Sequence, residues 1–181
     1  MASILNVDQI GHSTTGTTAL EIDTSGRVDM NASYVFDQWH LNAEHTTDGE
    51  SDLTAWSQVA FTGTGKISGM SHSSGIFAFP QTGLYKVTFH FMTRADATDN
   101  MTGGIYVTTD NSTYDQVAVL LTGDSDTVNS AVSSSVFINV TNVSNVKIKF
   151  RSISMDSASF VHGDSSKIET NVMFERVAPA Q

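Results

Sequence analysis

The 181-residue sequence contains no cysteine and only two prolines. Without cysteine, neither a disulfide nor a thiolate metal site can hold the fold together, which argues against the disulfide-rich modules of extracellular animal proteins. No apolar run approaches the roughly 20 residues of a membrane span, and the N-terminus lacks the basic and apolar regions of a signal peptide. We therefore expect no membrane insertion and no classical export.

Charge is also scarce, at 15% of residues, and positive charge is scarcest, with nine Lys and Arg against 19 Asp and Glu. The formal net charge of −10 excludes nucleic acid as an expected ligand, because phosphate binding needs a concentrated basic surface. Ser, Thr and Asn supply most of the polarity instead. This composition, with few runs of strong helix formers, favours an all-β fold.

The clearest pattern lies in residues 77–92, which read FAFPQTGLYKVTFHFM. After a break at Pro80 and a turn ending at Gly83, large apolar residues alternate with polar ones. Successive side chains of a strand point to opposite faces, so the alternation predicts a half-buried strand. The residues predicted to face the core are Tyr85, Val87, Phe89 and Phe91.

About ten short strand-like segments with turn signals between them follow from residue 34 onward. Such spacing predicts a two-sheet antiparallel sandwich or a barrel. The segments around Trp39, Trp56 and Phe137 carry apolar bulk on both faces. A second apolar face needs a cover, and oligomerisation is the usual one.

Residues 1–30 differ from the rest of the chain, because a polar Ser/Thr/Gly tract separates their few apolar residues. So short a segment buries little by itself, and we expect it to dock on its own domain or on another protein. We therefore divide the chain into an attachment segment, 1–30, and a main domain, 31–181. The residues predicted to make the attachment are Ile4, Val7, Ile10, Leu20 and Ile22.

Residues 77–90 resemble the signature of tumour-necrosis-factor-like jelly rolls of the complement globular-head type, with the pattern Phe, Pro, Gly-x-Tyr-x-Phe-x-Phe/Tyr. Val87 stands where an aromatic residue is usual, and residues 166–177 resemble the family's last strand without its small-residue motif. The resemblance covers about residues 33–178 and implies a ten-strand jelly roll assembled as a homotrimer. The core and trimer signature is Phe79, Pro80, Gly83, Tyr85, Phe89 and Phe91.

The N-terminal sequences MASILNVDQI (1–10) and ALEIDTSGRV (19–28) resemble the N-termini of structural and fibre proteins of tailed bacteriophages. Those proteins often join such a piece to a C-terminal jelly roll. The resemblance implies a virion surface protein, either a capsid decoration or head fibre or a tail-fibre component. Its N-terminus would bind capsid or tail proteins, and assembly would take place in the cytoplasm of the bacterial host.

No residue pattern indicates catalysis, since the sequence has no Gly-x-Ser-x-Gly elbow, phosphate loop or His-Glu-x-x-His motif. The six histidines are interpreted as structural or surface residues, although three copies of one histidine could bind a metal on a three-fold axis. Acidic clusters at residues 48–52, Asp96/Asp99 and Asp124/Asp126 raise calcium as an alternative, but none matches an EF-hand. We predict a non-enzymatic protein without a cofactor.

Lys147, Lys149 and Arg151 place three of the nine positive charges on one strand face. They could contact an anionic ligand or an acidic partner. The favoured interpretation is that they pair with Glu169 or Glu175 in the same trimer, or protect an edge strand from mispairing.

An alternative function is a carbohydrate-binding module that recognises a host receptor. Its candidate contacts are Tyr106 and Tyr114, with Asp110 and Asn111, which would engage host surface glycans. A bacterial complement-like adhesin is a third hypothesis, which the missing export signal disfavours.

Overall fold

The computed structural model describes residues 34–66, 69–96, 99–122 and 128–181, together with the backbone of residues 9–11, 18–22 and 28–29. All regular elements in these ranges are strands, which confirms the predicted all-β class. No helix long and apolar enough to cross a membrane occurs among them. Contacts divide the chain into two units, residues 1–34 and residues 35–181.

The first unit contains a small antiparallel sheet of three strands in the order β1 (Gln9–Gly11), β2 (Thr18–Ile22) and β3 (Val28–Asp29). Its backbone register places Ile10 opposite Leu20, and Ile22 opposite Val28. Ile4 and Val7 lie outside the described residues, as do the side chains of Ile10, Leu20 and Ile22. The attachment role of these five residues stays a prediction.

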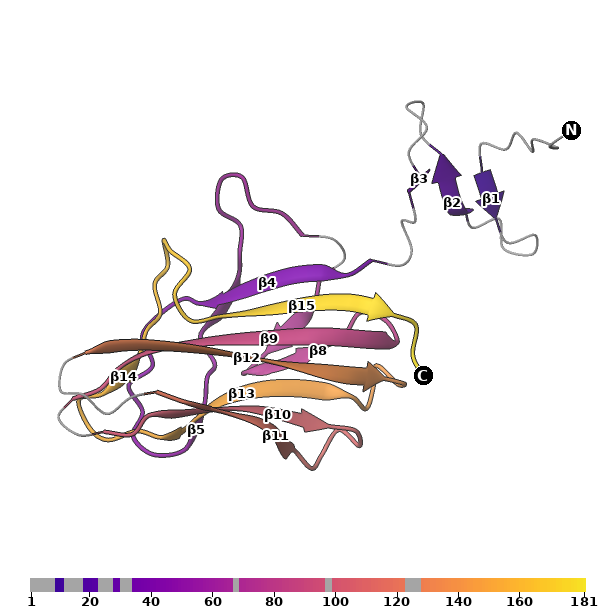
Figure 1. Ribbon diagram of the computed structural model, residues 1–181. Helices are drawn as coiled ribbons and strands as arrows, with labels where there is room; N and C mark the ends of the chain where they lie inside the picture. Colours follow the sequence, from indigo (N-terminus) through magenta and orange to yellow (C-terminus); the bar gives the residue numbers. More distant parts are fainter. Residues whose placement is uncertain are drawn as a thin grey trace, which may run out of the picture. The chain divides into compact units, whose positions relative to one another are not determined.

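The second unit is a sandwich of two antiparallel sheets, drawn as two layers in Figure 1. Three of the fifteen strands belong to the first unit, so twelve build the sandwich, against the ten expected. The extra ones, β5 (Ser51–Asp52) and β14 (Phe160–Val161), are two-residue pairings that are too short to show alternation.

The β9 sheet runs in the order β12 (Asn129–Val140), β9 (Gly83–Arg94), β15 (Asn171–Ala178), β4 (Phe36–Leu41), β6 (Trp56–Gln58), with β14 also paired to β9. The β13 sheet runs in the order β11 (Asp115–Leu121), β10 (Thr102–Thr108), β13 (Lys147–Ser154), β8 (Ile76–Ala78), β7 (Ser71–Ser73), with β5 also paired to β13. Neighbouring strands are mostly distant in sequence, as the colours of Figure 1 show.

Strand β9 has the predicted alternation and supplies much of the core. Tyr85, Val87, Phe89 and Phe91 are fully buried, and Phe89 meets Phe150 of the opposite sheet with ring centroids 4.9 Å apart. The hydroxyl of Tyr85 donates to the carbonyl of Gln81 (2.9 Å). Burial raises the pKa of Tyr85 to about 12.

The turn before β9 also follows the predicted signature. Phe79 is buried, and its ring centroid lies 4.7 Å from that of Tyr85. A side chain on Gly83 would come within 3.0 Å of the carbonyl oxygen of Ala178, so close packing against β15 requires glycine there. Phe79 and Gly83 therefore pack at the start of β9, whereas Pro80, the other signature residue of this turn, is exposed.

The expectation of an apolar second face is confirmed in part around Trp39 but not at Trp56. The outer face of β4 carries Phe36, which is 39% exposed. Trp56 is buried between the sheets, and Trp39 packs edge-on against Phe77 at a centroid distance of 5.4 Å. The inner face of β4 also contains the buried carboxylate of Asp37, which accepts hydrogen bonds from the Trp39 indole (2.8 Å), the Gln58 amide (2.8 Å) and the Met70 backbone (2.7 Å). A buried carboxylate whose hydrogen bonds are satisfied thus occupies an inner position of β4. The usual rule that polar residues of a strand face outward therefore fails for this strand.

Candidate functional site

The outer face of the β13 sheet carries the residues predicted as ligand or partner contacts. On β13, Lys147, Lys149 and Arg151 point outward, whereas Ile148 and Phe150 are buried in the core. The side chains of β10 and of the turn after it approach the cations of β13. The Nζ of Lys149 lies 4.7 Å from the ring centroid of Tyr114, and the guanidinium carbon of Arg151 lies 5.2 Å from that of Tyr106.

Two of the three cations are paired by carboxylates that come from β5 and the residue before it. Asp52 is the register partner of Arg151, and its Oδ2 lies 3.1 Å from Lys149 Nζ while its Oδ1 lies 2.6 Å from Arg151 Nε. Glu50 Oε1 lies 2.5 Å from the other side of the same guanidinium. We call Glu50, Asp52, Lys149 and Arg151 the ionic clasp.

Within one chain, Lys149 and Arg151 pair with Asp52 and Glu50 and not with Glu169 or Glu175, and pairing with these glutamates across a trimer stays a prediction. Glu169 instead lies 3.7 Å from the ring of His162. β13 is also an interior strand between β10 and β8, so edge protection does not apply to it. The actual partners precede β13 by about a hundred positions, as the 101-residue separation of Glu50 and Arg151 shows.

The predicted glycan contacts are largely engaged within the protein. Tyr106 is only 9% exposed, and its hydroxyl donates to Glu50 at 3.3 Å. Asp110 closes a turn by accepting from Thr108 Oγ1 (2.7 Å) and from the backbone of Ser112 and Thr113 (both 2.8 Å). These hydrogen bonds, led by the one from Thr108, hold the pKa of Asp110 well below its ordinary value. The arrangement leaves Tyr106 little surface for stacking on a sugar.

Tyr114 and Asn111, the other two residues predicted to contact a glycan, also support the local fold. Tyr114 is half-buried against Lys149, and burial raises the pKa of its phenol, so it stays neutral near pH 7. Asn111 adopts a left-handed backbone conformation with φ of 61°, which suits a tight turn between β10 and β11. Both therefore help to shape this corner of the sheet.

Lys147 differs from the other two cations of β13. Its Nζ donates to the carbonyl of Val143 (2.6 Å), and no carboxylate among the described residues forms an ion pair with it. It lines a surface depression of about 380 Å³. The other residues of this depression, which we call the Lys147 depression, are Ser71, His72, Ser73, Ser74, Ile76 and Ala78.

A second feature is apolar and lies where the sandwich opens between the edge strands β11 and β12. Leu121 is 69% exposed, Val119 52% and Phe137 66%. Val117 has no register partner because a bulge shifts the pairing between β10 and β11. Together with Phe137 it lines a groove of about 300 Å³, whose other apolar residues are Val107, Val136, Ile138 and Val146. We call these exposed residues and the groove the apolar edge.

Sequence reasoning identified Phe137 and predicted a strand over residues 114–121, but it missed the exposed apolar face of β11. The run VAVLL at 117–121 is apolar throughout, so it contains no alternation that would mark an outer face.

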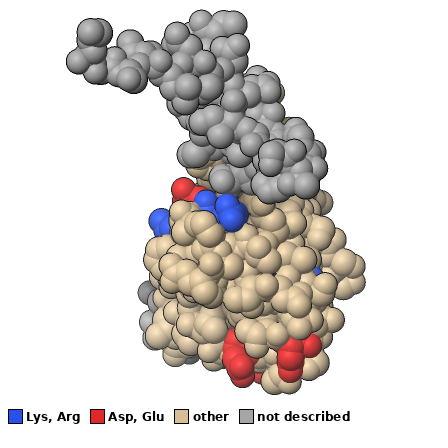
Figure 2. Space-filling view, turned by 90° about the vertical axis from the view of Figure 1, so that its right-hand side faces the viewer, with Lys and Arg blue, Asp and Glu red and all other residues tan. Residues whose placement is uncertain are grey.

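Figure 2 shows the end of the sandwich that carries the C-terminus, where most of the described surface is uncharged and acidic side chains gather at one border.

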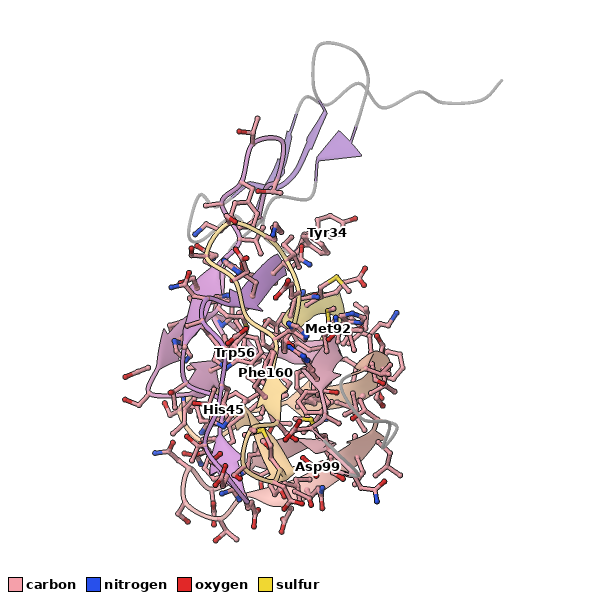
Figure 3. The ribbon with its side chains drawn as sticks, turned by 90° about the vertical axis from the view of Figure 1, so that its left-hand side faces the viewer. Tyr34, His45, Trp56, Met92, Asp99 and Phe160 are labelled. Atoms are coloured by element: carbon pink, nitrogen blue, oxygen red, sulfur yellow. The ribbon has the colours of Figure 1, made fainter. Side chains whose placement is uncertain are left out.

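Among the histidines and acids considered as metal ligands, His45 and Asp99 form hydrogen bonds within the chain. Figure 3 shows His45, Phe160 and Asp99 at the opposite end of the sandwich, coming from three separate segments. His45 Nε2 lies 2.7 Å from Ser51 Oγ, and burial lowers the pKa of this histidine. Asp99 accepts from the backbone of Asp156 (2.9 Å). Within the described ranges no group of three or more His, Asp or Glu is arranged to hold a metal, and Asp124 and Asp126 lie outside those ranges.

Comparison with known proteins gives a structural match only. No family model matches the chain, and no curated protein matches it. Murine APRIL at pH 5.0 superimposes with a TM-score of 0.59 and 11% identity, over 80% of this chain and 99% of that chain. Eiger TNF from S. frugiperda gives a TM-score of 0.59 and 13% identity, over 82% and 96% of the two chains. Residues 35–181 therefore form a tumour-necrosis-factor-like jelly roll, as the signature around β9 predicted.

Proposed function

We propose that this chain is a non-enzymatic structural protein that assembles as a homotrimer and is displayed on a bacteriophage virion. The apolar edge is the observation that carries the assembly. Phe137 and Leu121 leave most of their apolar surface in water, and burying each contributes about 1.5–3 kcal/mol. Val117 and Phe137 line one groove, and exposed apolar surface on a soluble domain typically marks an interaction surface.

A second copy of the same chain is the occupant that we assign to this edge. Each chain carries a net charge of −10, so two copies repel each other least when they meet at an uncharged surface. No Lys, Arg, Asp or Glu lines the groove of the apolar edge. Soluble oligomers are mostly closed and symmetric, and the resemblance of the β9 signature implies a three-fold assembly.

The place on a virion rests on the N-terminal resemblance. The contact division at residue 34 supports it, because it separates a small three-stranded unit from the jelly roll. We assign residues 1–30 to attachment on capsid or tail proteins, and the jelly roll to projection outward. Capsid decoration, head fibre and tail fibre are the locations that this arrangement allows.

Light scattering after gel filtration tests the assembly. The mass should be three times the 19.5 kDa of one chain. The double variant Leu121→Ser/Phe137→Ser should elute as a folded monomer. Ile168→Ser, at another exposed apolar residue, should stay trimeric. A monomeric natural chain, or a double variant that remains trimeric, would contradict the proposal.

Purified particles test the location. Mass spectrometry should detect the chain in virions, and imaging of labelled chain should place it on the head or the tail. A chain lacking residues 1–30 should still be trimeric but absent from particles. Incorporation of this shortened chain at the natural level would show that attachment lies elsewhere.

A further inference from the structure

The Lys147 depression has a geometric origin in two neighbouring rows of side chains on the β13 sheet. One row consists of Ser71, Ala78 and Lys147, which are register partners across β7, β8 and β13. The next row consists of Ser73, Ile76 and Lys149. Serine and alanine are short, so the surface sinks between the long lysines and the end of the hairpin.

The β7–β8 hairpin that forms one wall is held in a defined conformation. Ser74 and Gly75 both have positive φ, 50° and 86°, which is the geometry of a two-residue turn matched to strand twist. The Gly75 backbone N–H donates to His72 Nε2 (3.0 Å), and His72 stacks on buried Phe77 with centroids 4.7 Å apart. The serines of the wall are therefore positioned before any ligand arrives.

The serine hydroxyls of the depression are unengaged. No described residue accepts from or donates to the side-chain hydroxyls of Ser71, Ser73 and Ser74. Lys147 uses one of its three N–H donors on Val143 and keeps two for a ligand. Ile76 adds an apolar surface beside these groups.

We propose that the Lys147 depression binds an acidic monosaccharide unit, a pyranose ring that carries one carboxylate. The ring's C–H groups would contact Ile76 and Ala78, its hydroxyls would exchange hydrogen bonds with the serines, and its carboxylate would accept from Lys147. The volume of about 380 Å³ lies near the lower end of the range of about 300–1,000 Å³ for small-molecule sites. One sugar ring therefore fits better than an oligosaccharide.

Charge favours a ligand with a single negative group over a polyanion. The chain's net charge of −10 repels an extended polyanion at many points. Screening over about 8 Å at physiological salt confines the attraction of Lys147 to its immediate surroundings. The neighbouring Lys149 does not add a second free charge, because Asp52 holds it at 3.1 Å. One chain builds the whole site, so binding is independent of trimer formation.

Amide chemical-shift titration of the full chain tests the site. Sodium glucuronate and N-acetylneuraminate are the acidic probes, glucose is the neutral probe and acetate supplies the carboxylate alone. At least one acidic sugar should bind with a Kd of about 1 mM and change the amide chemical shifts of Ser73, Ile76 and Ala78. Glucose and acetate should each bind about tenfold more weakly or worse, because each lacks part of the complementary chemistry.

Two variants separate the contributions of charge and hydroxyl groups. Lys147→Gln should weaken the acidic sugar about tenfold or more and leave glucose unchanged, because it removes a charged hydrogen bond. Ser71→Val/Ser73→Val should weaken both sugars and leave acetate unchanged. Lys167→Gln, an exposed lysine at another place on the chain, is the matched control and should change nothing.

Three outcomes would overturn the proposal. They are acidic sugar and glucose binding equally, Lys147→Gln retaining natural affinity while its spectrum shows an intact fold, and shifts that map outside the depression. Binding of glucuronate but not N-acetylneuraminate, or the reverse, identifies the class of acidic sugar and supports the site.

Discussion

Tyr106 packs directly over Gly104, which precedes it on the same face of β10. A Cβ on Gly104 would lie 2.7 Å from Tyr106 Cε2 and 2.8 Å from Ile153 Cδ1. Because Gly104 has no side chain, the ring of Tyr106 can lie beside Arg151. Gly104→Ala should lower the free energy of unfolding by about 1–3 kcal/mol, the usual cost of overpacking.

Urea unfolding measures this change. Gly65→Ala is the matched control, because a Cβ there meets nothing within 4 Å, and it should stay within about 0.5 kcal/mol of the natural chain. Equal stabilities of the two variants would show that Tyr106 moves aside freely.

Phe89→Ala should cost about 3–5 kcal/mol of unfolding free energy, because it opens a cavity between the sheets at a fully buried ring. Its strand neighbour Thr88 points to the other face and bonds Ser135 Oγ at 2.8 Å. Thr88→Ala should therefore cost no more than about 1.5 kcal/mol. A loss below about 1 kcal/mol for Phe89→Ala would mean that the opposite sheet closes over the site.

The ionic clasp should show energetic coupling between Arg151 and Asp52. A double-mutant cycle with Arg151→Met and Asp52→Asn should give a coupling energy of about 0.5–3 kcal/mol, since both groups are partly buried. The pair Lys167–Asp164 is 3.6 Å apart and its lysine is exposed, so it should give less than about 1 kcal/mol and should lose it in high salt. Equal coupling in the two pairs would contradict a special role for the clasp.

The carboxyl of Asp110 should remain ionised at a pH where ordinary aspartates are protonated. Hydrogen bonds, chiefly from Thr108, favour its charged form, so its folded pKa lies below the unfolded value of 3.8. Its contribution to stability is thus present above the unfolded pKa and is lost as pH falls through the folded pKa. Carbon-detected NMR titration should show the low midpoint, and Thr108→Val should move it back upward.

His72 should make the fold less stable in mild acid. Burial lowers its pKa, and the Gly75 N–H donates to its Nε2, so the folded state holds the neutral ring. Below the ordinary pKa of 6.5 the unfolded chain binds more protons, and the unfolding free energy falls until the folded pKa is passed. Urea unfolding at about pH 7 and about pH 5 should show a smaller difference in His72→Gln, whose amide cannot titrate. An unchanged difference would assign the effect to His45.

The fold could be predicted from the sequence wherever strands are long and alternate. β9 shows this best, since Tyr85, Val87, Phe89 and Phe91 are all buried as their spacing requires. β4 could not be predicted in the same way, because Asp37 lies inside the sandwich and Phe36 outside. A local pattern cannot reveal that N–H donors of Gln58 and Met70, from other segments, will join Trp39 in satisfying a buried carboxylate.

The candidate sites were predictable only in part. The sequence placed three cations on one face of β13 but could not separate Lys147 from its neighbours. That separation depends on β5, a two-residue pairing that brings Asp52 to Arg151 and ends before it reaches Lys147. Likewise, the Lys147 depression follows from short side chains that meet across three strands, and spacing within one strand does not show this.

The position of β15 has a consequence for the order in which the chain can fold. β15 lies between β9 and β4, and it pairs with both. The two parts of the β9 sheet therefore cannot join until Ala178 has left the ribosome. At about 5–20 residues per second, translation of the roughly 130 residues between β4 and β15 takes about 7–26 seconds, and β4 waits that long for this partner. We expect the β9 sheet to form in a late, concerted step, after β15 has been made.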